Sequence, residues 1–166
     1  MLRFIGSLAL GAVCVMYGSE RAAQLMRRRD FLRRFCGALS VIETEISFGR
    51  RALGDIFSEL DSPELYGLFT DCADALEKSG IRNAWHSAVS SAAKMAGLAA
   101  DEQAELISLG TELGRSDVEG QKNILRRAAA YASARLEAAE DEYRRMGRVY
   151  RSCGLLVGAL LILILI

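Results

Sequence analysis

The chain has 166 residues, a length typical of one domain, and its 21 Lys and Arg residues balance its 21 Asp and Glu residues. This balance gives the molecule no electrostatic bias toward nucleic acid as a partner. Its four cysteines are scattered without a C-x-x-C spacing, which argues against a disulfide or zinc framework and favours a reducing compartment.

The charged residues are confined to the middle of the chain. Every charge except Arg3 lies between Glu20 and Arg151, so apolar segments occupy both ends. Apolar ends around a charged middle favour membrane anchors at both termini. The sequence therefore predicts three parts: an N-terminal transmembrane anchor at 1–19, a cytoplasmic helical bundle at 20–150 and a C-terminal transmembrane anchor at 151–166.

The apolar stretch from Leu2 to Gly18 is near the lower limit of about 17–25 residues for a membrane-spanning helix. A cleaved signal peptide is the alternative, because Arg3 before an apolar run resembles the opening of one. However, no small-x-small cleavage site follows, and Val13 precedes Cys14 where a lipoprotein signal has a small residue. We therefore expect an uncleaved anchor.

Arginines gather on the inner side of both predicted anchors. Positive charge near the ends of membrane helices remains cytoplasmic, so both clusters place the central domain in the cytoplasm. A solvated helix face is the alternative, but it does not explain the clustering at both ends. The arginines are Arg21, Arg27, Arg28, Arg29, Arg33 and Arg34 near the first anchor, and Arg144, Arg145, Arg148 and Arg151 near the second.

The central domain is predicted to be helical throughout, because no segment alternates apolar and polar residues with period two. Ser62 and Pro63 are expected to start the third helix, and Asp101 to cap the fifth. Short connections between the helices predict a compact antiparallel bundle. The six helices are expected from the membrane to Phe48, Leu53 to Leu60, Ser62 to Gly80, Arg82 to Met95, Asp101 to Gly114, with Ala104, Ile107 and Leu113 inward, and Ser116 to Ile166.

The last helix is expected to be continuous and to end inside the membrane. Ser116 followed by Glu119 is a capping box, and apolar residues then recur every three or four positions as far as Tyr150. Gly154 and Gly158 form a GxxxG pair that permits close helix approach. The alternative is that glycine is simply common in membrane helices.

No residue pattern predicts catalysis. His86 is the single histidine, and metal binding needs several convergent ligands. The stretch Gly49–Gly54 resembles a phosphate loop, but Asp55 follows it where lysine is required. Glu43 and Glu45 are two positions apart and point to different helix faces. We expect a protein that is not an enzyme, without cofactor, metal or nucleic acid.

Several strings along nearly the whole chain carry a resemblance to a known family. They are Leu39 to Gly49 followed by Leu53, Ala84-Trp85, Leu109-Gly110, Leu113 to Asp117 with Gln121, and Tyr150 to Gly154 before the terminal apolar run. On these strings the chain resembles the stage III sporulation protein AB family of endospore-forming bacteria; Cys153 departs from its pattern. The structural and interface candidates are Glu43, Glu45, Gly49, Leu53, Trp85, Gly114, Ser116, Asp117, Gln121, Gly154 and Gly158.

The resemblance implies a fold similar to the cytoplasmic domains of the GspF platform proteins of type II secretion and type IV pilus machines, which are six-helix bundles. It implies a membrane platform in the outer forespore membrane of the mother cell, within the channel complex that reaches the forespore. That platform would couple a secretion-type ATPase, stage III sporulation protein AA, to the membrane assembly.

Expected partners are the stage III sporulation complex proteins, membrane lipids and, as an open alternative, further copies of the chain. Candidate docking elements are the loop Gly49–Asp55 and the arginines at the membrane junctions, for which anionic lipid is the favoured ligand. A membrane-anchored regulator or sensor with protein partners is the alternative function. No kinase, cyclase or nucleotide motif in the sequence supports it.

Overall fold

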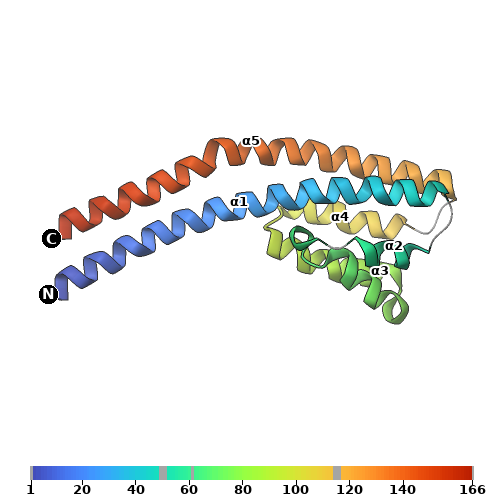
Figure 1. Cartoon of the computed structure of the whole chain (residues 1–166), viewed down its shortest axis with the longest axis horizontal. Coiled ribbons are helices and arrows are strands. Elements are labelled where there is room, and N and C mark those ends of the chain that lie inside the picture. The colour runs from blue at the N-terminus through green and yellow to red at the C-terminus, as the bar shows by residue number, and fades with distance from the viewer. Residues whose placement is uncertain (1, 49–51, 61, 114–116, 166) are drawn as a thin grey trace. The chain divides into compact units, whose positions relative to one another are not determined.

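The computed structural model describes residues 2–48, 52–60, 62–113 and 117–165, with side chains except at 2–11, 14, 151, 154, 155, 158 and 160–165. All secondary structure in these residues is helical, which confirms the all-α prediction (Figure 1). The elements are α1 (Leu2–Phe48), α2 (Leu53–Glu59), the 3-10 helix η1 (Pro63–Leu65), α3 (Leu68–Ala96), α4 (Ala100–Glu112) and α5 (Val118–Leu165).

The predicted count of six helices is not confirmed, and the difference lies at Gly80. The described residues form five α-helices, because the expected third and fourth helices are one element, α3, interrupted by a kink. Gly80 has φ 72° and ψ 159°, a conformation that glycine adopts without the steric cost of a Cβ. The glycine therefore bends the helix but does not separate two elements.

The expected start of the third helix at Ser62 and Pro63 is wrong. These residues begin η1, and the Ser62 hydroxyl donates to the Glu64 carboxylate instead of capping the backbone. Tyr66 and Gly67 follow in the left-handed conformation, with φ 52° and 73°, and redirect the chain before α3 begins. The Ser62-Pro63 pattern, which predicts the start of a helix, therefore begins only the short 3-10 helix η1.

The expected cap of the fifth helix is also wrong. Ala99 precedes α4, and its N–H donates to Oε2 of Glu102 at 2.9 Å. Asp101 instead forms an ion pair with Arg135 on α5. Leu113 is buried as expected, but Ala104 is exposed, and the inward face consists of Glu102, Leu106, Leu109, Gly110 and Leu113.

The structure divides into two compact units, and α1 and α5 contribute to both. The terminal unit comprises Met1–Arg29 and Ala138–Ile166, and the central unit comprises Asp30–Glu137. In the central unit α3 packs against α2, η1 and α4. Its core is a chain of aromatic rings in successive contact, with centroids 5.3–6.2 Å apart: Phe31, Phe35, Phe69, Phe57 and Trp85.

Ion pairs connect α5 to α1 and α4 in the central unit. Arg127 Nη2 lies 2.8 Å from Glu112 Oε2 on α4, and Arg126 contacts α1 as described below. The predicted apolar stripe of this helix is confirmed in part, since Leu125 and Ala132 are buried but Met146 is exposed. Val118, at its start, is exposed.

In the terminal unit, the segments of α1 and α5 run antiparallel and side by side, blue and red in Figure 1. Arg28 Nη1 lies 2.6 Å from Glu142 Oε2, and the Arg29 guanidinium lies 4.4 Å from the centroid of the Tyr143 ring. Small residues pack between the helices where they are buried, at Gly18, Ala22, Ala139 and Gly147.

Within the residues that the structure describes, no helix has both the length and the hydropathy needed to cross a membrane. The predicted transmembrane anchors at 1–19 and 151–166 are therefore not supported.

Candidate interaction surfaces

Trp85 is a core residue, and two of the sequence strings meet around it. Its ring is 1% exposed and contacts Phe57 and Phe69, and its Nε1 donates to the Leu106 carbonyl oxygen at 2.6 Å. A Cβ built at Gly110 would lie 2.0 Å from Trp85 Cδ1, closer than any real contact. Ala84-Trp85 and Leu109-Gly110 therefore specify one close approach between α3 and α4.

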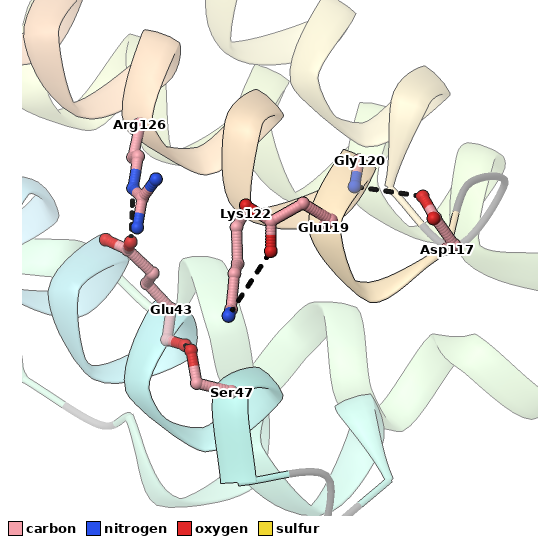
Figure 2. Close-up of polar contacts among 7 residues, drawn as sticks. All are labelled: Glu43, Ser47, Asp117, Glu119, Gly120, Lys122 and Arg126. Carbon is pink, nitrogen blue, oxygen red and sulfur yellow. Dashed lines mark hydrogen bonds and ion pairs between the residues drawn. The ribbon is translucent and has the colours of Figure 1, made fainter.

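Glu43 and Asp117 each make a polar contact close to the junction of α1 and α5 (Figure 2). Glu43 Oε1 lies 2.7 Å from Arg126 Nε, so this residue joins the two helices. The Gly120 N–H donates to Asp117 Oδ1 at 3.0 Å, so Asp117 caps α5. Glu119, expected in the capping box, lies 3.5 Å from Lys122.

The remaining sequence candidates form no common site in the described residues. Leu53 is the first residue of α2 and is half-buried, as are Glu45 and Gln121. The predicted roles of Gly49, Gly114 and Ser116 fall outside the described residues. Gly154 and Gly158 lie in α5, but the packing around them is outside the described side chains.

A groove of about 540 Å³ lies between α1 and the segment from the end of α2 to η1. Its α1 wall repeats at helical spacing and contains Arg34, Gly37 and Val41. Across it lies Glu64, whose Oε2 is 3.5 Å from Arg34 Nε. The Ser62 hydroxyl bond lowers the pKa of Glu64, and Arg34 lowers it further.

The sequence prediction missed this groove. Its only signal was Gly37 and Val41 at i and i+4, on the face of α1 opposite the apolar stripe. Glu102 was also missed: it is fully buried on the inward face of α4, for which only Ala104, Ile107 and Leu113 were predicted. Its place in the first turn of α4 could have marked it as a capping residue, because an early glutamate bonds backward to the helix start.

The described side chains contain no group of three or more His, Cys, Asp or Glu residues able to hold a metal. His86 is exposed on α3. Cys36, Cys72 and Cys153 are free thiols. Burial raises the pKa of the Cys72 thiol to about 11, so this residue is a poor nucleophile at neutral pH.

The sequence matches the family described as Stage III sporulation protein AB over residues 3–166. The chain belongs to this family. The Stage III sporulation protein AB of Bacillus subtilis (strain 168) is 27% identical over 171 residues, which cover 99% of each chain. No solved structure gives a significant match. The family resemblance is therefore confirmed, whereas the likeness to GspF platform proteins is not shown.

Proposed function

We propose that this protein is a non-catalytic scaffold in sporulation that binds a secretion-type ATPase and holds it at a membrane. The observation that carries the proposal is the family match over residues 3–166, together with a Bacillus subtilis relative named as a stage III sporulation protein. The platform role within a channel complex is what the family resemblance implies, and it belongs to the same proposal.

The packing of the central unit supports a scaffold. Its five aromatic core rings connect α1, α2 and α3, and the ion pairs of α5 reach both α1 and α4. Such cross-connection holds surface residues in fixed positions, which lowers the entropy that binding a partner costs.

The groove along α1 is the surface that we propose for the ATPase. Val41 is 47% exposed at one end, and Arg33, Arg34, Glu59 and Glu64 supply charges of both signs around the rim. An apolar contact within a charged rim is the usual arrangement of a protein–protein interface.

Membrane attachment through the terminal segments and a cytoplasmic location of residues 20–150 complete the proposal. They are supported by the sequence, in which apolar ends flank arginine clusters. Other proteins of the sporulation complex, and further copies of the chain, would bind surfaces other than the groove.

Capture of the ATPase by the full-length protein in detergent tests the proposal. Val41→Asp should abolish capture, whereas Met95→Asp should not, because Met95 is 49% exposed on α3 but does not line the groove. Equal capture by both variants would refute the groove as the docking surface. If a host lacking the gene completes spore formation normally, the scaffold role is wrong and the regulator alternative is favoured.

A further inference from the structure

The terminal unit has a fixed antiparallel register between α1 and α5. Arg28 pairs with Glu142, and the Arg29 guanidinium lies over the Tyr143 ring. Because the two segments run antiparallel in this unit (Figure 1), each step toward the N-terminus on α1 is matched by a step toward the C-terminus on α5. Residues before Arg21 on α1 and residues after Tyr150 on α5 lie at the same end of this unit.

That end exposes large apolar side chains from both helices. Val13, Met16 and Tyr17 on α1 are 62%, 69% and 62% exposed, and Leu156 and Val157 on α5 are 67% and 48% exposed. Most of the exposed large apolar side chains that the structure describes belong to this unit. A patch of this kind marks a contact with a protein or a membrane.

Exposed arginines on both helices lie next to this apolar end. Arg144 is 71% exposed, and its pair with Glu140 is long, at 3.5 Å. Arg145 and Arg148 are exposed and make no hydrogen bond or ion pair with any residue that the structure describes. Arg21 donates to the Tyr17 hydroxyl, at 2.9 Å from Nη2, and to Gln24 Oε1, at 3.5 Å from Nη1, and neither partner is a carboxylate.

The arginines and apolar residues of α5 share one face. Arg145, Arg148, Ser152 and Leu156 follow one another at steps of three, four and four, and Val149 lies four residues after Arg145. This face therefore passes from cations to apolar side chains within about three turns. Tyr17 and Tyr150 lie between the two zones, where tyrosine is enriched in proteins that contact a bilayer.

Acidic residues neutralise only part of this zone: Glu140 pairs with Arg144, but Arg145 and Arg148 have no acidic partner among the described residues. Glu20 is engaged by Arg27 at 2.6 Å, and Glu142 is engaged by Arg28. Asp141 is exposed, but the register places it on the side of the arginines away from the apolar end.

We propose that Arg21, Arg144, Arg145 and Arg148, here called the arginine collar, bind the headgroup phosphates of anionic phospholipids. The exposed apolar side chains beyond the collar then enter the acyl region of the same leaflet. The inference rests on the proposed membrane attachment and names the lipid class that it selects. A membrane is favoured over a protein partner because cations and apolar side chains are arranged in the order of a leaflet, headgroup before acyl chain.

Flotation of the full-length protein with vesicles tests the collar. Vesicles of phosphatidylcholine alone are compared with vesicles containing phosphatidylglycerol. Each arginine near an anionic surface contributes about fivefold in binding, so Arg145→Gln/Arg148→Gln should lower the preference for phosphatidylglycerol by about 25-fold. The matched control is Arg82→Gln/Arg127→Gln, which removes the same charge from exposed positions of the central unit and should keep the preference.

Added salt should weaken the preference of the unaltered protein, because it shortens the screening length. Inorganic phosphate should compete no better than sodium chloride of equal ionic strength; stronger competition would indicate a free-anion site and overturn the lipid assignment. Equal preference in the collar and control variants would also overturn it. ATPase capture is measured on the same samples. If the collar variant keeps its preference for phosphatidylglycerol and capture is intact, this inference is refuted and the scaffold proposal stands.

Discussion

Replacing Gly110 with alanine should disrupt the packing of α4 against α3, although a change from glycine to alanine stabilises most helices. A Cβ at this position would lie 2.0 Å from Cδ1 and 2.3 Å from Cγ of Trp85. Ordinary contact begins at 3.4 Å, so the ring would have to move by roughly 1.4 Å. A movement of that size breaks the 2.6 Å bond from Nε1 to the Leu106 carbonyl oxygen.

The opposing terms can be compared. Alanine gains about 1 kcal/mol over glycine inside a helix. Overpacking a core costs about 1–3 kcal/mol, and leaving a buried donor without a partner costs about 1–3 kcal/mol more. The steric terms therefore exceed the helix propensity, and we expect the free energy of unfolding to fall by about 3 kcal/mol.

The assay uses the only tryptophan of the chain. Trp85 fluorescence reports directly on the ring that must move, so Gly110→Ala should shift its emission to longer wavelength and lower the urea midpoint. The matched control is Gly37→Ala, because no atom lies within 4 Å of a Cβ built at Gly37 in α1. This variant should be stabilised by about 0.5–1 kcal/mol, with unchanged emission.

A double-mutant cycle separates the clash from any general effect. A Trp85→Ala background lacks the two ring atoms closest to the new methyl group, so Gly110→Ala should cost far less there than in the unaltered protein. Unfolding in this background is followed by circular dichroism, because no tryptophan remains. If Gly110→Ala is as stable as the unaltered protein and its emission does not move, the close approach described here is wrong.

Three further changes test the central unit and α5. Ala132→Pro should destabilise the protein by about 3 kcal/mol or more, because proline removes a helix hydrogen bond at a fully buried position. The control Ala132→Gly should cost only about 1 kcal/mol, with both variants measured by circular dichroism. If the proline variant is as stable as the unaltered protein, a continuous α5 is refuted. Asp117→Ala should lower stability by about 1 kcal/mol by removing the cap of α5, and Asp117→Asn should restore it in thermal unfolding. Two single-cysteine variants, one keeping Cys72 and one keeping Cys36, are treated with a thiol reagent at pH 8. The Cys72 variant should react more slowly, because Cys72 is fully buried and its pKa is raised to about 11. Equal reaction rates would contradict the burial of Cys72.

The pKa of Cys72 also sets a direction for stability against pH. Burial raises the folded pKa from its ordinary 9.0 to about 11, so the unfolded chain loses the thiol proton first as the pH rises. The folded state then holds more protons than the unfolded state, and stability falls between those two values. Below pH 9 the thiol is protonated in both states, so it adds nothing to the pH dependence of stability.

The apolar stripes of the long helices could be predicted from the sequence because they repeat at helical spacing. Phe31, Phe35 and Leu39 on α1, and Trp85 and Val89 on α3, repeat at steps of four and are buried. In these segments the local pattern and the tertiary packing agree, so periodicity alone identifies the inward face.

Prediction failed where a polar residue took a structural role. Glu102 occupies the inward face of α4, so the apolar repeat appeared to run through Ala104 and Ile107 instead. Ser62 and Pro63 give the signal of a helix start, but Tyr66 and Gly67 adopt the left-handed conformation and end this turn after η1. Local signals locate turns better than they predict which element follows.

The same limit applies to the arginines of α5, and it bears on the proposals. In sequence, Arg126, Arg135, Arg145 and Arg148 are equivalent cations on one helix. The structure separates them: Arg126 and Arg135 pair with acids on α1 and α4, whereas Arg145 and Arg148 pair with none of the described residues. A cation with an acidic partner in its own chain connects helices, and a cation without one is available to an external anion. Neutralising the first kind should lower the stability of the fold without changing lipid preference, and neutralising the second should do the reverse.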